Sequence, residues 1–422
     1  MEHRPTILIA ATDRWYPTAR LGMALTQVGC IVDAVCPAGH PLELTNAARR
    51  LYDYNGLAPL RSFTHAVHHT NPDLVIPADD LATRHLHDLY QRGNGRGKTG
   101  AEICHLIRRS LGDPTGFVTI LERSAFINLA RQEGIRVPNT VVLADKEDLL
   151  DWISREGFPA VLKANGTSGG DGVKILNTLE DAERAWRKLQ APPLLARALK
   201  RSLLDRDLTL LRPCIRRQRH VVNAQAFVRG HEATSTVACW EGNVLAGLHF
   251  EVVEKMGTTG HATVVRQIEH PEMTAAASKI ARRLKLSGIH GLDFMLEAET
   301  GDAYLIEINP RTTQVGHLAL GDAHDLPAAL AGALIGQTIS RPAIASENDM
   351  VALFPQEWKR NPKSPYLATA YHDVPWQEPA MVSACARQAL KHAPQVSPAY
   401  PPKKAAQSTE APTPLVAEQN KI

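Results

Sequence analysis

Carboxylate, amide and guanidinium side chains occur at every second position near the end of one stretch, GLDFMLEAETGDAYLIEINPR, which runs from 291 to 311. Because side chains alternate between the two faces of a β-strand, a strand over 303–311 would present these polar groups together. A strand that only closes a core has no reason to carry them. The alternation predicts one face with Leu305, Glu307, Asn309 and Arg311, and an apolar face with Tyr304, Ile306 and Ile308.

A second acid, Asp293, lies on the preceding predicted strand, and the residues between the two strands, Glu299-Thr300-Gly301-Asp302, are typical of a turn. If the loop has an odd number of residues, Asp293 lies directly opposite Glu307 in an antiparallel pair. Hard oxygen ligands of this kind suit Mg²⁺ that is shared between protein and phosphates. The plain alternative is a surface strand with solvated charges.

Upstream, a short apolar strand over 158–163 ends at Lys163 and leads into a glycine-rich loop. The loop, 164–172, contains four glycines and two hydroxyl side chains, and a further strand is expected over 173–176. The backbone N–H groups of such a loop can cradle phosphates, and the lysine adds a positive charge. An ordinary mobile turn is the alternative.

A third segment, 223–232, combines a predicted strand, a glycine-containing turn and the acid Glu232. In a nucleotide site, the strand would present its backbone to an adenine, and the acid would bind the ribose hydroxyls. The same pattern is also typical of an ordinary β-hairpin, so this segment has two interpretations.

Taken in order, these segments resemble the ATP-grasp superfamily over roughly Leu121 to Gly336. In that family an ATP is clamped between two α+β subdomains, and a carboxylate is activated as an acyl phosphate, usually for attack by an amine. The Glu-x-Asn-Pro-Arg sequence at 307–311 is most similar to carbamoyl-phosphate synthetase and biotin carboxylase. The implied fold class is α/β and α+β, with an N-terminal Rossmann-like pre-ATP-grasp domain followed by a two-subdomain ATP-grasp fold.

The resemblance implies a role for each matching residue, with catalysis assigned to Lys163, Asn309 and Arg311. The sequence departs from the family at Arg123, which stands where many members have a second phosphate-binding lysine, and at Gln225, where a glutamate is common. The implied phosphate contacts are Lys163, Arg123, Ser168, Gly169, Gly170 and Gly172; the adenine and ribose contacts are Gln225, Phe227, Val228 and Glu232; the metal ligands are Asp293, Glu307 and Asn309; and Arg311 faces the transferred phosphoryl group or the acyl phosphate.

The expected reaction is a ligation that splits ATP to ADP and phosphate, with a small-molecule carboxylate and an amine as substrates. Such chemistry needs positioning and charge neutralisation, which a lysine, an arginine and one or two Mg²⁺ ions (or Mn²⁺) supply. Two alternatives remain: an enzyme that forms an acyl phosphate without joining an amine, and a non-catalytic ATP-binding module. The presence of all three metal ligands favours catalysis.

Composition sets the remaining expectations. The chain has 422 residues and a formal charge of +3, and its six cysteines show no metal-ligand spacing. It contains no apolar run of 18 residues and no signal-peptide pattern at its start. We therefore expect a cytoplasmic protein with no membrane contact and no nucleic-acid partner, and the chain is compatible with a homodimer.

We expect four regions along the chain. Strand–helix alternation predicts a parallel sheet in the first of them, and Asp79-Asp80, at the end of a strand, either faces a substrate crevice or caps a helix. The glycine-rich stretch 93–99 lacks the first glycine of a P-loop and is expected to be a basic surface loop. The regions are a Rossmann-like domain (1–112), an ATP-grasp domain (113–340) with a lid subdomain (about 138–226), an extension (341–396) and a disordered tail (397–422).

Overall fold

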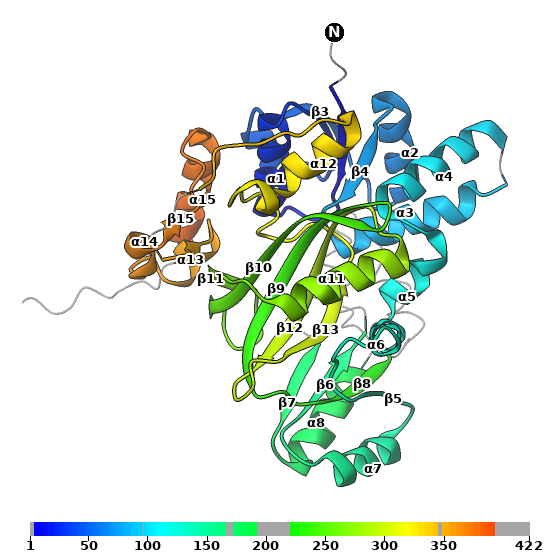
Figure 1. Ribbon diagram of the computed structural model, residues 1–422, viewed down its shortest axis with the longest axis vertical. Helices are drawn as coiled ribbons and strands as arrows, with labels where there is room; N and C mark the ends of the chain where they lie inside the picture. Colours follow the sequence, from blue (N-terminus) through cyan, green and yellow to red (C-terminus); the bar gives the residue numbers. More distant parts are fainter. Residues whose placement is uncertain (1–3, 96, 166–171, 192–219, 345–347, 393–422) are drawn as a thin grey trace, which may run out of the picture.

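The computed structural model describes residues 4–95, 97–165, 172–191, 220–344 and 348–392. Three expected phosphate contacts, Ser168, Gly169 and Gly170, lie outside these residues, as does the tail 397–422. Figure 1 shows three layers of structure along the long axis: a parallel sheet at one end, a large, mostly antiparallel sheet in the middle, and a smaller sheet with two helices at the other end.

The N-terminal sheet has the order β3-β2-β1-β4, and all its strands are parallel, as expected for a Rossmann-like topology. Along β1, Ile7 and Ile9 pack into one apolar cluster while Leu8 and Ala10 pack into another, so both faces of the sheet are covered. The elements are β1 (Thr6–Ala10), α1 (Tyr16–Gln27), β2 (Ile31–Cys36), η1 (Pro41–Leu44), β3 (Ala48–Asp53), α2 (Pro59–Thr70), β4 (Leu74–Pro77), α3 (Asp80–Gly93) and α4 (Gly97–Leu111).

Two features of this region differ from the sequence interpretation. Strand β3, at the edge of the sheet, was not predicted, because its two arginines interrupt the apolar pattern that indicates a buried strand. An exposed edge strand does not require that pattern. The basic loop expected over 93–99 is shorter, since α4 already begins at Gly97. The stretch follows helix α3 rather than a strand, which agrees with the interpretation that it is no P-loop.

The middle layer is a seven-stranded sheet with the order β13-β12-β9-β10-β11-β14-β15. Helices α6 and α11 pack on one face of it, and α12 packs on the other, between the sheet and α1. The elements are η2 (Pro114–Gly116), α5 (Phe117–Leu121), α6 (Arg123–Gln132), β9 (Gly230–Trp240), β10 (Asn243–Lys255), β11 (Ala262–Gln267), α11 (Pro271–Leu284), β12 (Gly288–Glu297), β13 (Ala303–Asn309), η3 (Asp322–His324) and α12 (Leu326–Ile335).

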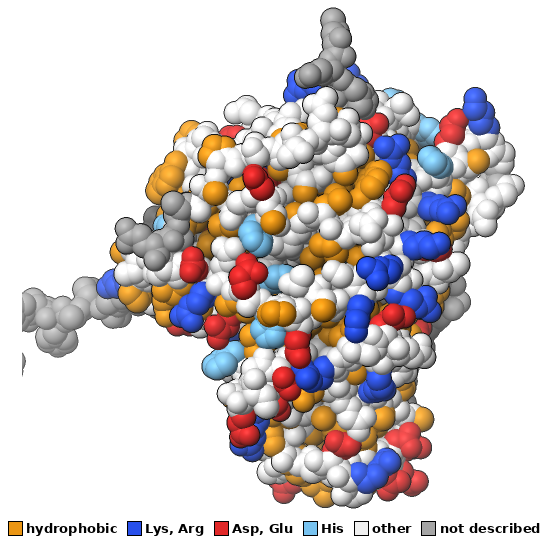
Figure 2. All heavy atoms as spheres, viewed as in Figure 1, with side chains coloured by type: hydrophobic (Ala, Val, Ile, Leu, Met, Phe, Trp, Pro, Cys, Tyr) orange, Lys and Arg blue, Asp and Glu red, His pale blue; other side chains and the backbone are white. Residues whose placement is uncertain are grey.

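The smaller sheet, β5-β8-β6-β7, is antiparallel and is called the lid sheet below. Two capped helices, α7 and α8, cover one face through Trp152 and Trp186, and the other face looks toward the middle sheet. In Figure 2 this end is a narrow lobe on which acidic and basic side chains are intermixed. The elements are β5 (Thr140–Leu143), α7 (Lys146–Glu156), β6 (Ala160–Ala164), β7 (Val173–Leu176), α8 (Leu179–Gln190) and β8 (Val222–Ala226).

The hairpin interpretation of 223–232 is wrong. Strand β8 belongs to the lid sheet and β9 to the seven-stranded sheet, so the residues between them connect two layers. Gly230 begins β9 so close to β12 that a Cβ there would lie 1.8 Å from the carbonyl oxygen of Leu296. The glycine is therefore required by close backbone packing of two strands and not by a hairpin turn.

The C-terminal extension packs on the main body. Strand β14 adds to the seven-stranded sheet beside β11, and Phe354 is fully buried. The buried Arg20 on α1 pairs with the buried Asp373, which ties the extension to the N-terminal layer. Among the described residues, no helix is both long and apolar enough to cross a membrane. The elements are β14 (Met350–Ala352), α13 (Gln356–Arg360), α14 (Tyr366–Thr369), β15 (Tyr371–His372) and α15 (Pro379–His392).

Candidate functional site

The acidic residues of β12 and β13 meet, and a bulge rather than the turn brings them opposite each other. Asp293 pairs directly with Glu307, but the next pair joins Phe294 to Leu305, so Ile306 is an extra residue on β13. This bulge corrects the simple alternation expected for the strand, because Leu305 and Ile308 pack in the same apolar cluster. Bulges redirect side chains near functional sites. Here the bulge keeps Glu307 out of that cluster and beside Asp293.

Asp293 is held by two side chains. The hydroxyl of Thr234 on β9 donates to Asp293 Oδ1 at 3.0 Å, and the amide of Asn309 donates to Oδ2 at 2.9 Å. Burial, together with the neighbouring charge of Glu307, raises the pKa of the Asp293 carboxyl to about 6. Two adjacent carboxylates in a desolvated place repel each other, so a cation between them would be stabilised.

Two cations from other elements balance Glu307. Arg123, the first residue of α6, forms an ion pair with it, and the same guanidinium donates to the carbonyl of Ala164 at 3.4 Å. Burial opposes ionisation of Glu307, but the charges of Arg123 and Lys163 outweigh it and hold the pKa of this carboxyl below its usual value. Lys163 on β6 is 7% exposed, and burial lowers the pKa of its ammonium group to about 8.

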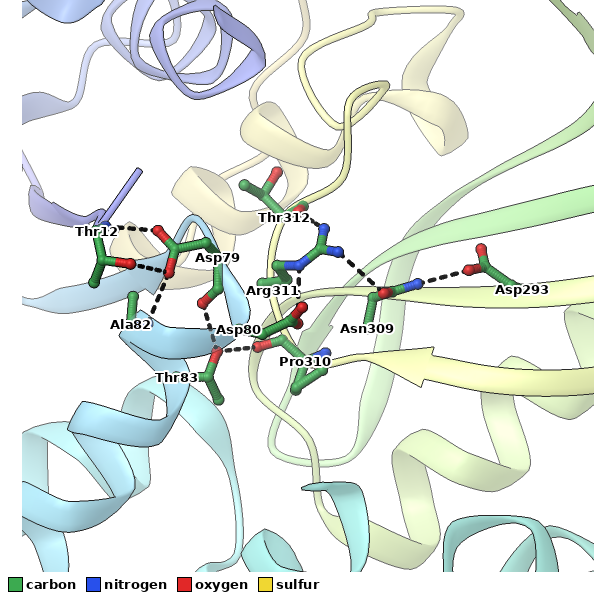
Figure 3. Close-up of polar contacts among 10 residues, drawn as sticks. All are labelled: Thr12, Asp79, Asp80, Ala82, Thr83, Asp293, Asn309, Pro310, Arg311 and Thr312. Atoms are coloured by element: carbon green, nitrogen blue, oxygen red, sulfur yellow. Dashed lines mark hydrogen bonds and ion pairs between the residues drawn. The ribbon is translucent and has the colours of Figure 1, made fainter. Parts of the chain in front are cut away.

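Arg311 lies two residues after the end of β13 and points toward the N-terminal layer (Figure 3). Its Nε donates to Asp80 Oδ1 at 3.0 Å, while Nη2 donates to Asn309 Oδ1 at 3.2 Å. Nη1 donates to the carbonyl of Thr312 at 3.2 Å, and the ring of Trp15 lies 5.9 Å from the guanidinium carbon. A polar chain therefore runs from Asp80 through Arg311 and Asn309 to Asp293.

The residues expected to contact the adenine and ribose lie around the connection between the two sheets. Gln225 is buried in β8, where its amide donates to Thr140 Oγ1 at 3.0 Å. Phe227 and Val228 are half-buried in the connection itself. Glu232, at the start of β9, is 2.5 Å from Lys255 Nζ on β10.

Of the glycine loop, the structure describes only the base. The carbonyl of Gly172 accepts a hydrogen bond from the Ala164 N–H at 2.9 Å, one residue after Lys163. The two strands that flank the loop are adjacent in the lid sheet, with Lys163 opposite Val173. The loop therefore starts and ends beside Lys163.

Sequence reasoning missed two participants. Thr234 carries no signal of its own, because a threonine in a strand is ordinary. Lys255 lies in the segment 250–266, for which the sequence suggested only a place near an acceptor pocket, so its pairing with Glu232 was not predicted. Asp80 had been singled out with Asp79, and the structure separates the two: Asp79 caps α3 by accepting from the Ala82 N–H at 2.8 Å, while Asp80 pairs with Arg311.

The donor set fits a hard cation. Two carboxylates and an amide oxygen, from Asp293, Glu307 and Asn309, are the ligands that Mg²⁺ prefers when it keeps its other positions for phosphates and water. Within the described ranges, no group of three or more His, Cys, Asp or Glu side chains is arranged to hold a metal. A site with two carboxylates therefore suits a metal ion that brings phosphate ligands with it. It suits less well a structural metal ion whose ligands all come from the protein.

The comparisons with known proteins agree with this arrangement. Residues 122–323 match the family model of the carbamoyl-phosphate synthase L chain, ATP binding domain. The carbamoyl phosphate synthase large chain of Clostridium acetobutylicum is 23% identical over 201 residues, which are 47% of this chain and 17% of that protein. Over residues 122–323, a little under half of the chain, the fold and the site are similar to those of the ATP-grasp superfamily.

Two solved structures show the same fold. N5-carboxyaminoimidazole synthetase from Staphylococcus aureus has a TM-score of 0.54 and 13% identity, over 80% of this chain and 79% of that chain. The biotin carboxylase domain dimer of the Hydrogenobacter thermophilus 2-oxoglutarate carboxylase, in complex with MgADP, ADP and bicarbonate, has a TM-score of 0.54 and 14% identity, over 81% and 72%. The chain spans less than a fifth of the length of the first curated relatives that it matches.

Proposed function

We propose that this protein is an ATP-dependent ligase, which activates a small-molecule carboxylate as an acyl phosphate for attack by an amine. One observation carries the proposal: Lys163 of the lid sheet and Arg123 of α6 converge on the acidic pair of β12 and β13. Four charged side chains from two separate layers would not gather in this way without a polyanionic ligand to share the charge. ADP and phosphate are the expected nucleotide products.

Lys163 and Arg123 would bind the phosphates of ATP, with the glycine loop closing over them. Arg123 is paired with Glu307. Phosphate oxygens would compete for its guanidinium, and Glu307 would then be free to bind metal. Asp293, Glu307 and Asn309 would hold one or two Mg²⁺ ions, which supply charge neutralisation at the phosphates when bound.

The remaining residues would orient the two ends of the nucleotide. The connection after β8, with Phe227 and Val228, would contact the adenine, while the buried Gln225 side chain keeps this part of the lid sheet in place through Thr140. Glu232 would bind the ribose and is oriented by Lys255. Arg311, at the other end, would face the transferred phosphoryl group or the acyl phosphate, where its positive charge stabilises developing negative charge.

The test is nucleotide product analysis with MgATP and pools of small carboxylates, each with and without amines. ADP and phosphate formed only with a particular acid and amine would support the ligase. ADP formed with the acid alone would favour an enzyme that stops at the acyl phosphate. AMP and pyrophosphate would contradict the proposed chemistry, and tight ATP binding without turnover would favour a non-catalytic binding module.

A further inference from the structure

The contact between Asp80 and Arg311 joins two layers of the fold at the reacting end of the site. Asp80 begins α3, directly after β4 of the parallel sheet, and Arg311 follows β13 of the seven-stranded sheet, 231 residues later. The Asp80 side chain is 40% exposed and that of Arg311 is 18% exposed. Asp80 is therefore open to a ligand on one side while it binds Arg311 on the other.

Helix α3 does not need the Asp80 carboxylate. The capping work is done by Asp79, whose side chain accepts from the N–H of Ala82 at 2.8 Å and from the N–H and hydroxyl of Thr12 at 2.6 and 2.7 Å (Figure 3). Two neighbouring aspartates thus have separate tasks. Asp79 holds the helix start to the loop after β1, and Asp80 makes its one side-chain hydrogen bond among the described residues with Arg311.

The backbone around the pair is fixed. The Thr83 hydroxyl donates to the carbonyl of Pro310 at 2.8 Å, and the N–H of Thr312 donates to the carbonyl of Pro77 at 3.2 Å. These two hydrogen bonds flank Arg311 and hold the start of α3 against the turn after β13. Because both sides of the ion pair rest on ordered backbone, Asp80 can set the direction of the guanidinium.

A count of donors shows what this contact leaves for a ligand. A guanidinium has five N–H groups. Asp80, Asn309 and the Thr312 carbonyl take three of them, one from each nitrogen, so one N–H remains on each of Nη1 and Nη2. Two N–H groups on the terminal nitrogens can bind two oxygens of a phosphoryl group or an acyl phosphate.

We propose that Asp80 is a positioning residue for the reaction: it holds the Nε–H of Arg311 so that the two remaining N–H groups face the transferred phosphoryl group or the acyl phosphate. The expected effect of Asp80 on turnover rests on the proposed ligase function. Its geometric content is independent of that function. The contact also orients Asn309, because the amide oxygen that accepts from Arg311 leaves the amide nitrogen to donate to Asp293.

The test compares Asp80→Asn with Asp88→Asn, which makes the same change of charge at an exposed position on the same helix. With MgATP and bicarbonate as the probe, Asp80→Asn, which leaves only a neutral amide oxygen to accept from the Arg311 Nε–H, should lower kcat for ADP formation about tenfold, the lower end of the range for hydrogen bonds to charged groups. The KM for ATP should stay within about threefold, and Asp88→Asn should match the parent. A kcat within twofold of the parent for Asp80→Asn would overturn the proposal.

A second measurement separates this inference from the proposed function. The ¹H–¹⁵N signals of arginine Nε groups report their hydrogen bonding without turnover, and Arg311→Lys identifies the signal of Arg311 by its loss. We expect Asp80→Asn to shift or broaden that signal, and Asp88→Asn to leave it unchanged. An unchanged Arg311 signal in Asp80→Asn overturns the positioning role, even if the parent protein shows no ADP formation with bicarbonate.

Discussion

Replacement of Thr234 by valine tests how the acidic pair is oriented. Valine keeps the shape of threonine on β9 and removes only the hydroxyl that donates to Asp293 Oδ1 at 3.0 Å. A hydrogen bond to a charged group contributes about 1.5 to 3 kcal/mol, which corresponds to about 10- to 150-fold in an equilibrium constant. Because Asn309 still donates to the other oxygen of Asp293 at 2.9 Å, we expect the lower end of this range.

The expected result is therefore a roughly tenfold higher Mg²⁺ concentration for half-maximal ADP formation at saturating ATP, in line with the loss of contacts that orient metal ligands. The titration is best made at pH 8, where protonation of Asp293 does not contribute. The free energy of unfolding should change by less than about 1 kcal/mol, because the shape of the side chain is kept.

Thr236→Val is the matched control. Thr236 lies two residues further along the same strand and the same face, and its hydroxyl is hydrogen-bonded to that of Thr313 at 2.6 Å. It makes no contact with the acidic pair, so its Mg²⁺ requirement should equal that of the parent. If Thr234→Val shows the same half-saturating Mg²⁺ concentration as Thr236→Val, the assignment of Asp293 as a metal ligand is refuted.

Three further predictions follow from buried charges. Lys163→Met should lower kcat about 100-fold or more. It should not lower the melting temperature, because a buried charge is replaced by an apolar side chain of similar volume. Lys174→Met in the next strand is the control. Glu307→Ala should abolish turnover with MgATP while calorimetry still detects metal-free ATP binding, and unimpaired turnover would exclude the metal role. Asp373→Asn should cost about 3 kcal/mol or more in urea unfolding at pH 7, since Arg20 is left buried without a counter-charge.

The last of these variants also has a pH signature. Burial opposes ionisation of Asp373, but the charges of Arg20 and His317 outweigh it and hold the pKa of this carboxyl below its usual value. A depressed pKa in the folded state gives stability that is present above the unfolded value, about 3.9, and is lost as the pH falls through the folded value. Melting curves between pH 2.5 and 7 should show a smaller acid-induced loss for Asp373→Asn than for the parent; an equal loss would contradict this account.

Short-range sequence patterns predicted the structure well where a residue type has a single common structural role. The turn residues 299–302 predicted a hairpin, and β12 and β13 form one, but the pairing of Asp293 with Glu307 depends on the extra residue Ile306. Helix α11 buries the apolar residues that recur at helical spacing along it. Short-range sequence patterns failed for β8 and β9, which resemble the two strands of a hairpin but belong to different layers. The residues around a strand do not show which distant strand it will pair with.

The sequence by itself determined which chemical groups are available: an acid pair on a hairpin, a lysine before a glycine loop, and an arginine after Asn309-Pro310. Each of these follows from short-range rules of strand alternation and turn chemistry. Only the tertiary structure decided which groups meet. The bulge at Ile306, the pairing of Arg123 with Glu307 and the reach of Asp80 to Arg311 depend on packing between layers, where burial of charge requires partners from residues up to 231 positions apart.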